Sequence, residues 1–289
     1  MKEKIGVLFL MFLWVTMLEA QEKVHISEIE ERNVHGRTVI YANDVQYDGQ
    51  VYENYVHPKL KYTVKAGVKE GPYELYYENR QLKRKTSFKD DKYDGQYEEY
   101  YENGQLAIRT SFKEGKYHGP LVMYYKNGQK EAEGNHLHGN FDGEQKKYYE
   151  NGNTKSIVNY KNGLKQGVSF KYYENGDLKE SATYSNDLLS GAYENFYEDL
   201  ALYVKTAYEN GQKEGEFFMY HENGQLKRKG SYSQGKENGA FQIFHENGKL
   251  KRKGYFKDGR LSGEYETYDE AGRLVNKTTY KNGQEISSL

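Results

Sequence analysis

A glycine recurs every 24 residues along most of this chain, nine times without a slip. Numbering each unit from its glycine as position 1 places an aromatic residue at position 6 in all nine units and at position 18 in eight. A fixed period of this length indicates a repeat architecture, in which each unit buries its apolar side chains against its neighbours. The chain is therefore predicted to form nine units over residues 71–286. The recurring glycines are Gly71, Gly95, Gly119, Gly143, Gly167, Gly191, Gly215, Gly239 and Gly263.

Each unit is predicted to contain two strands and two turns. Positions 2–7 and 12–18 are the strands, and positions 8–11 are usually Glu-Asn-Gly-Gln, as at 102–105, or a close variant of it. Asn-Gly between aromatic runs indicates a hairpin, because both residues tolerate positive φ. By period two, the Leu common at position 12, the small residue at position 16 and the aromatic residue at position 18 share one face. The predicted fold is all-β: an elongated antiparallel β-hairpin array forming a single twisted meander sheet.

The register of the hairpin has two alternatives. A two-residue Asn-Gly loop pairs position 7 with position 12, whereas a three-residue loop with a glycine bulge pairs position 6 with position 12. Position 6 is always aromatic, and position 7 drifts to His and Asp in the last three units, which favours position 6 as core. Arg80 replaces the turn glycine in the first unit and Asp199-Leu200 replaces Asn-Gly in the sixth, so local hairpin geometry is in doubt there.

The composition agrees with strands and turns. The chain has 31 Tyr, 12 Phe and 30 Gly against three Pro, and strands favour aromatic residues while turns favour glycine. The net charge of -1 excludes a nucleic-acid binder driven by bulk charge. The absence of cysteine excludes disulfides, thiolate metal sites and a cysteine nucleophile.

The first 20 residues have the three-part pattern of a signal peptide. Lys2 and Lys4 precede a 14-residue apolar run, and Ala20 is suited to be the last residue before cleavage. A 14-residue helix spans only about 21 Å, less than the roughly 30 Å of a bilayer core. The chain is thus predicted to be exported, to the periplasm, the outer surface or the medium. Residues 21–70 are predicted to be an N-terminal cap with a degenerate repeat, and 287–289 a short tail.

No residues with a catalytic or cofactor-binding pattern stand out. His136 and His138 are two apart and could share a face, but no third ligand is evident. The carboxylates recur with the repeat, for example at position 8, whereas a catalytic pair is a singular feature on irregular backbone. We therefore expect no catalytic residue, no cofactor and no metal site, and a protein that is not an enzyme.

The repeat resembles a known family. The unit that runs from Phe112 through Gly115, Gly119, Tyr124-Tyr125 and Asn127-Gly128 resembles the bacterial variant of the MORN repeat, some members of which carry an antitoxin-type label. The resemblance covers 71–286. It implies an elongated β-hairpin array that serves as a scaffold for contacts with proteins or membranes.

Two sets of side chains are candidates for a binding surface. Tyrosine offers a large contact area at low entropic cost, so a row of exposed rings suits a protein partner. Basic triplets after the Leu suit an anionic membrane or a surface glycan, the alternative function, although cross-strand ion pairs are the favoured explanation for them. Exposed edge strands also permit oligomers. The candidate binding face is Tyr77, Tyr101, Tyr125, Tyr149, Tyr173, Tyr197, His221 and His245, and the candidate basic stripe is Lys83, Lys85, Lys227, Lys229, Lys251 and Lys253.

Overall fold

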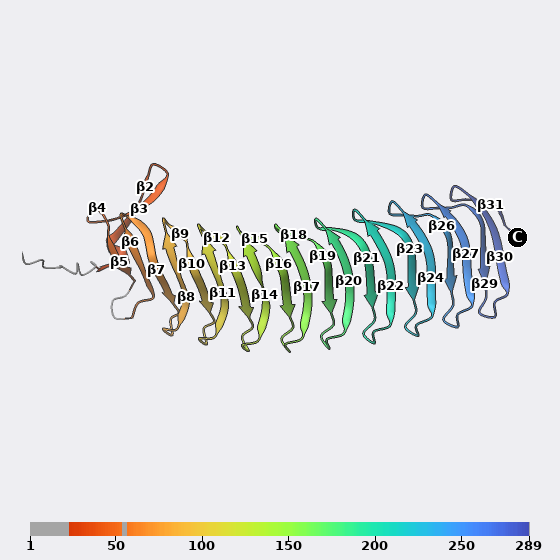
Figure 1. The fold of residues 1–289 in the computed structure, drawn as a ribbon, viewed down its shortest axis with the longest axis horizontal. Helices are drawn as coiled ribbons and strands as arrows, with labels where there is room; N and C mark the ends of the chain where they lie inside the picture. Colours follow the sequence, from red (N-terminus) through yellow and green to blue (C-terminus); the bar gives the residue numbers. More distant parts are fainter. Residues whose placement is uncertain (1–22, 54–56, 289) are drawn as a thin grey trace, which may run out of the picture.

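The computed structural model describes residues 23–53 and 57–288, and the predicted signal peptide lies outside them. In this part of the chain, 28 strands form one long sheet, and three more form a small separate sheet. Figure 1 shows the long sheet as a twisted ribbon whose strands follow one another in chain order from one end to the other. The predicted all-β hairpin array is therefore confirmed, with a repeat of about 24 residues and without closure into a barrel.

The strands fall into four groups. The N-terminal elements are β1 (Lys23–His25), the 3-10 helix η1 (Ile26–Glu28), β2 (Ile29–Val34), β3 (Arg37–Ala42), β4 (Val45–Gln46), β5 (Gly49–Tyr52) and β6 (Leu60–Lys65). The first strands of the units are β7 (Val68–Tyr76), β10 (Gly95–Tyr100), β13 (Gly119–Tyr124), β16 (Gly143–Tyr148), β19 (Gly167–Tyr172), β21 (Leu188–Phe196), β23 (Gln212–Tyr220), β26 (Gly239–Phe244) and β29 (Gly263–Tyr268). The second strands are β8 (Leu82–Lys89), β11 (Leu106–Lys113), β14 (Lys130–Leu137), β17 (Thr154–Lys161), β20 (Leu178–Ser185), β22 (Leu202–Glu209), β24 (Leu226–Ser233), β27 (Leu250–Lys257) and β30 (Leu274–Lys281). Short connecting strands are β9 (Lys92–Tyr93), β12 (Lys116–Tyr117), β15 (Asn140–Phe141), β18 (Leu164–Lys165), β25 (Lys236–Glu237) and β28 (Arg260–Leu261), and the chain ends with β31 (Gln284–Ser288).

The first turn of each unit settles the register. In unit two, Tyr100 pairs with Leu106, and the register shifts by one residue between Glu99 and Tyr100. The same pairing of position 6 with position 12 occurs in all nine units. Of the two predicted alternatives, the structure therefore has the three-residue loop with a bulge. Within the loop only the third residue, as at Gly104, has positive φ, so the Asn before it is not required for a left-handed backbone conformation.

The second turn is the one in which two successive residues have positive φ. Glu114 and Gly115 have φ of 52° and 79°, and they join the directly paired Lys113 and Lys116. Two central residues with positive φ define a type I′ turn, whose twist matches that of the strands it connects. The tight hairpin signal expected at positions 9 and 10 thus operates at positions 20 and 21 instead.

The bulge divides the side chains between two faces differently from the period-two expectation. Because position 12 lies opposite position 6, its Leu faces the same side as positions 2, 4, 6, 15 and 17; we call this side the ion-pair face. Positions 3, 16 and 18 face the other side, which we call the aromatic face. The expectation that positions 12, 16 and 18 share one face is therefore wrong, since the extra residue at position 13 reverses the alternation.

The most buried residues of the array lie on the aromatic face at positions 3 and 16. Tyr97, Phe217 and Phe241 at position 3 have at most 8% of their surface exposed, and Ala182 at position 16 is fully buried. Rings from positions 3 and 18 contact each other, as for Tyr97 and Phe112, whose centroids are 5.2 Å apart at 61°. Such pairs add about 0.5–1.5 kcal/mol beyond area burial. Position 6 is only half-buried, so the preference for it as core is wrong.

The N-terminal region holds the cluster of buried apolar residues. Ile40 of β3 is 1% exposed and packs with Val51 of β5 and Val64 of β6, which are 0% and 1% exposed. Strand β1 pairs in parallel with β5 and forms one edge of the long sheet. Gly67 accepts the backbone N–H of Ile40, and a Cβ at Gly67 would lie 2.4 Å from Val39 Cγ1, so a glycine is required there.

Candidate binding surface

The residues of the candidate binding face form a ladder between neighbouring hairpins. Each tyrosine hydroxyl at position 7 donates a hydrogen bond to the position-6 carbonyl of the next unit, as Tyr77 does to Tyr100 at 2.8 Å. His221 and His245 use Nε2 in the same way, at 3.2 and 3.1 Å from the carbonyls of Phe244 and Tyr268. All eight side chains are half-buried. Their polar atoms thus bind within the array, and what remains for a partner is the exposed part of each ring.

A second ladder follows the same edge through the turn asparagines. Asn127 accepts the backbone N–H of Gln129 at 2.9 Å and donates to the carbonyl of Glu150, in the next turn, at 3.2 Å. The second contact recurs at Asn79, Asn151, Asn223 and Asn247. The Glu-Asn-Gly turn is therefore a structural device, which explains its regular recurrence.

The basic triplets are divided between the two faces. Lys83 at position 13 lies over the Tyr77 ring, 5.3 Å from its centroid, on the aromatic face. Two residues later, position 15 contacts position 4 on the ion-pair face, as Lys253 does with Glu266 at 2.8 Å. The bulge is again the cause, since it places positions 13 and 14 on one side. A continuous basic stripe needs both lysines of a triplet on one face, and the structure separates them.

Positions 4 and 15 form a row of ion pairs along the ion-pair face. Arg109 contacts Glu98 at 2.9 Å, and Lys205 contacts Glu194 at 3.0 Å. Besides the single Val122 on β13, the row loses its charges in two stretches: at Ile157, Phe170 and Ser181 in the middle, and at Phe218 and Gln242 toward the C-terminal end. Exposed pairs of this kind stabilise the fold by at most about 1 kcal/mol each. Losing a pair at the two interruptions therefore costs little stability, and these two places are considered below as binding surfaces.

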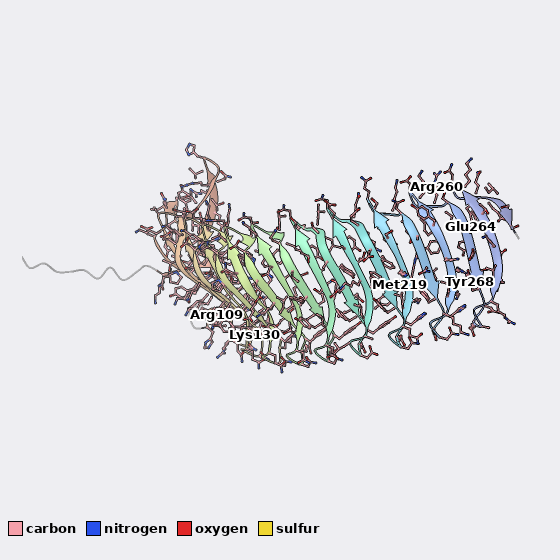
Figure 2. All side chains as sticks on the ribbon, turned by 45° about the vertical axis from the view of Figure 1, so that its right-hand side comes forward. Arg109, Lys130, Met219, Arg260, Glu264 and Tyr268 are labelled. Atoms are coloured by element: carbon pink, nitrogen blue, oxygen red, sulfur yellow. The ribbon has the colours of Figure 1, made fainter. Side chains whose placement is uncertain are left out.

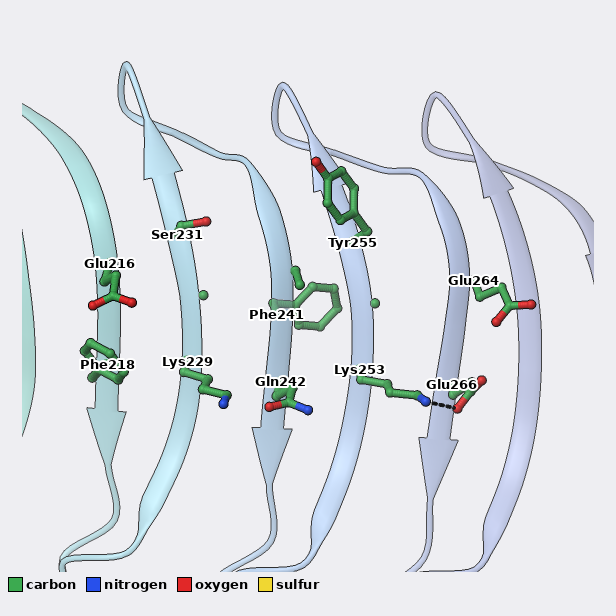
Figure 3. Close-up of a pocket in the computed structure, with 13 residues that line it drawn as sticks. Glu216, Phe218, Lys229, Ser231, Phe241, Gln242, Lys253, Tyr255, Glu264 and Glu266 are labelled. Atoms are coloured by element: carbon green, nitrogen blue, oxygen red, sulfur yellow. Dashed lines mark ion pairs between the residues drawn. The ribbon is translucent and has the colours of Figure 1, made fainter.

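A groove of about 700 Å³ lies at the second interruption, across units seven to nine. Figure 3 shows Phe218, Gln242 and Lys229 from adjacent strands along it, with Tyr255 and Glu264 farther up the sheet. Tyr255 is 47% exposed. Gly230 and Gly254 line the groove with their backbone, because position 16 faces the opposite, aromatic side. It is lined by Glu216, Phe218, Lys229, Gly230, Ser231, Ala240, Phe241, Gln242, Lys253, Gly254, Tyr255, Glu264 and Glu266.

The two glycines make room for Phe241 on the aromatic face. A Cβ on Gly254 would lie 2.9 Å from Phe241 Cε1 and 3.2 Å from Tyr265 Cδ2, and a Cβ on Gly230 would lie 3.4 Å from Phe241 Cβ. Gly134 is the remaining glycine at position 16, and there the Gln145 side chain occupies the space that a Cβ would fill. Glycine at position 16 therefore leaves room on the aromatic face for the side chain that packs against it.

Some of the charged groups in the groove already form ion pairs within the chain. Hydrogen bonds from Lys253 and Tyr268 lower the pKa of Glu266 to about 2, so this carboxylate is ionised and held. Glu264 contacts Lys277 at 2.8 Å but stays 63% exposed. Lys229 forms no ion pair with any residue that the structure describes. The groove thus offers an unpaired ammonium group beside aromatic rings.

Sequence reasoning identified the rows but missed this groove. The signal for it in the sequence is Phe218 and Gln242, at a position that usually carries a charge.

The remaining histidines do not form a recognisable metal site. His136 lies in the aromatic row, and the His118 and His138 rings are 5.6 Å apart. Among residues 23–53 and 57–288, no three His, Asp or Glu residues gather closely enough to hold a metal ion. Within the same residues, no helix is long and apolar enough to cross a membrane.

Comparison with protein families assigns the repeat. The family model described as MORN repeat variant matches eight segments that together make up more than half of the chain. The chain belongs to the MORN repeat variant family. The sixth unit is not matched, yet its strands β21 and β22 pair in the same register as the others. The matched segments of this MORN protein are 69–90, 93–114, 117–138, 141–162, 165–186, 213–234, 237–258 and 261–282.

More specific relatives are not found. No curated protein matches the chain. Among solved structures, a chain in the crystal structure of TcdB2-TccC3-Cdc42 is 10% identical, with a TM-score of 0.17, and the match covers 89% of this chain. It spans only 18% of that other chain. A porin-like protein from Bacteroides uniformis is also 10% identical, with a TM-score of 0.15, over 83% of this chain and 91% of that one.

Proposed function

We propose that this MORN protein is an exported, non-catalytic scaffold that binds a protein partner at the cell envelope or surface through the groove of units seven to nine. MORN repeats support a binding-type scaffold in general. The observation that carries the proposal is the groove itself, where Phe218 and the 47% exposed Tyr255 lie beside charges of both signs. Aromatic residues are enriched at protein interfaces, which also carry a polar rim.

The chemistry of the groove defines the partner segment. Phe218 suits an apolar or aromatic side chain, and Lys229, which pairs with it across the strands, suits a carboxylate close to that side chain. Tyr255 offers a second ring farther along the groove. Because a few aromatic anchors provide most of the energy of an interface, the rings should matter more than the surrounding charges. The partner segment is thus expected to carry an apolar anchor next to an acidic residue.

Capture of envelope or surface proteins by the immobilised chain tests the proposal. A specific partner should bind with micromolar or better affinity. Tyr255→Thr should weaken this binding at least tenfold; the fold accepts Thr there, because Thr279 occupies the same position in the ninth unit. Lys251→Thr, an exposed change outside the groove, is the matched control. Binding that survives Tyr255→Thr and Phe218→Glu together would place the partner elsewhere.

A membrane- or glycan-binding role remains the second candidate. It is motivated by the exposed Lys85, Lys227 and Lys251, although the lysines of each triplet point to opposite faces. Electrostatic binding to anionic vesicles should weaken as salt is raised. Co-sedimentation that is unchanged after charge reversal of Lys227, Arg228 and Lys229 would eliminate it.

Export is tested separately. The predicted cleavage after Ala20 is checked by fractionating cells and sequencing the amino terminus of the mature protein. A mature chain that begins near Gln21 in the periplasm, on the outer surface or in the medium supports export. A chain that keeps Met1 in the cytoplasm contradicts it.

A further inference from the structure

The middle of the ion-pair face carries an apolar column. Strand β18 at the end of the fourth unit and β19 at the start of the fifth follow each other along one line of the sheet. Their side chains on this face are Leu164, Val168, Phe170 and Tyr172, at positions 22, 2, 4 and 6. Leu164 is 42% exposed and Val168 is 41% exposed. At no other boundary between two units are position 22 of the first and positions 2, 4 and 6 of the second all apolar.

The neighbouring strands extend this apolar patch. Ile157 of β17 pairs directly with Phe170. Leu188, at the start of β21, is 49% exposed. An exposed apolar patch rimmed by charges commonly marks an interaction site. Here the patch replaces the ion pairs found elsewhere at positions 4 and 15.

The charges that flank the column have opposite signs at equal distances from it. Two strands before β19 the residue in the row is Lys146 on β16, and two strands after it is Glu194 on β21. Three strands before is Glu133 on β14, and three strands after is Lys205 on β22. If a second copy of this row were laid against the first with its strand order reversed about β19, each of these charges would therefore meet an opposite charge.

We propose that this face binds a second copy of the chain, face to face, about a two-fold axis along β19. Such an axis keeps each position at its height along the strands and reverses the strand order. It places Phe170 against Phe170, Lys146 of one copy against Glu194 of the other, and Glu133 against Lys205. An axis along the array would instead place every charge against itself. A two-fold interface must be self-complementary, and this row is.

The size of the patch fits an interface. Seven strands at about 4.8 Å and about six residues at about 3.3 Å give roughly 600 Å² of sheet per copy. A standard interface buries about 800 Å² per partner. The groove of units seven to nine begins at β23, on the same face but outside the seven strands of this patch. Figure 2 shows how the sheet twists along its length.

Light scattering with size-exclusion chromatography of the full chain tests the dimer between 1 and 100 µM. The wild type should have twice the chain mass of 33.8 kDa. Phe170→Glu should raise the dimer dissociation constant at least tenfold, because two like charges then meet at the axis. Glu98 and Glu194 occupy the same position in other units, so the fold tolerates this change. The control is Val275→Lys, an exposed residue at position 13, where Lys83 occurs.

The charge pattern gives an independent test. Lys146→Glu and Glu194→Lys should each weaken the dimer, while the double variant should recover a large part of the loss. Thermal melting verifies that every variant is folded. A wild-type monomer at 100 µM, or a dimer unaffected by Phe170→Glu, would overturn the proposal. So would small-angle scattering that shows a dimer about twice as long as the monomer, because that means association through edge strands. None of these results depends on partner capture by the groove.

Discussion

The hydroxyl of Tyr101 donates a hydrogen bond of 2.6 Å to the backbone carbonyl of Tyr124, one repeat farther along the chain. The bond joins two hairpins at the edge where their first turns lie side by side. Because each unit can only contact its neighbours, the cohesion of the array depends on such nearest-neighbour links. The ladder therefore ties the position-7 tyrosines to the stability of the array as much as to binding.

The same ladder explains how position 7 changes along the sequence. His221 and His245 replace Tyr because an imidazole nitrogen can reach the same carbonyl. Asp269 stands at this position in the ninth unit, and it contacts Arg273 at 2.8 Å within its own turn. The two histidines, which in the sequence look like drift of an exposed residue, are therefore substitutions that preserve a contact.

Removing one hydroxyl of the ladder should destabilise the chain. Tyr125 donates to the carbonyl of Tyr148 at 2.7 Å. Tyr125→Phe keeps the ring and deletes the bond, so the free energy of unfolding should fall by about 1 kcal/mol. Urea unfolding followed by circular dichroism measures the change. Tyr255→Phe is the control, since its hydroxyl has no hydrogen-bond partner among the described residues; an equal loss in both variants would contradict the structural role of the ladder.

The fold could be predicted from the sequence because the period, the aromatic positions and the turn glycines are repeated nine times. The two faces could not, because the extra residue at position 13 reverses the alternation after the first turn, and a sequence does not show which strand holds the extra residue. Tyr97 illustrates the consequence. It is 8% exposed at a position that also carries Gln145 and Ser169, so its variability hid the centre of the packed face.

The candidate site was less predictable for a related reason. A binding surface was sought in the most regular rows, yet regular residues such as Tyr101 and Asn127 maintain the contacts between units. The groove and the apolar column lie where Phe218 and Phe170 replace the usual charge. In a repeat protein, singular positions are therefore the better indicators of specific binding, whereas recurring ones report the architecture.

The sixth unit should gain stability from a glycine in its first turn. Leu200 has a φ of 67° and is 54% exposed. An L-residue in the left-handed region is strained by about 1–2 kcal/mol, and glycine relieves the strain at a smaller entropic cost in the unfolded chain. Leu200→Gly should therefore raise the free energy of unfolding by roughly 0.5–1 kcal/mol in urea titrations. Ala201→Gly, one residue outside the strained position, should not; a loss of stability in Leu200→Gly would show that its side chain packs usefully.

Acid should release the ion pair between Lys253 and Glu266. The bonds from Lys253 and Tyr268 lower the pKa of Glu266 from 4.5 to about 2. A lowered carboxyl pKa contributes stability above pH 4.5 that is lost as the pH falls toward 2, because the unfolded chain takes up the proton first. Lys253→Met should raise the carboxyl pKa in a carbon-13 NMR titration and lower the melting temperature at pH 7 more than at pH 3. Lys251→Met, at an exposed neighbouring lysine, should change neither; an unmoved Glu266 titration in Lys253→Met would refute the assignment.

His136 should make the third unit sensitive to mild acid. Its ring is 6% exposed and lies between the rings of Tyr117 and Phe141, with centroids 5.1 and 4.3 Å away. Its Nδ1 atom is buried without a hydrogen-bond partner in the described part of the chain, and burial lowers the pKa of the imidazole below 6.5.

The sign of the effect follows from proton binding. Below a pH of about 6.5 the unfolded chain binds a proton at His136 that the folded chain excludes, so stability falls as the pH decreases toward the lower folded pKa. Every other unit has Phe or Tyr at this position. His136→Tyr should therefore reduce the loss of melting temperature between pH 7 and pH 5, while His245→Tyr, on the half-buried ladder, serves as the comparison. Equal slopes of melting temperature against pH in the wild type and His136→Tyr would mean that the folded array accepts the proton without penalty.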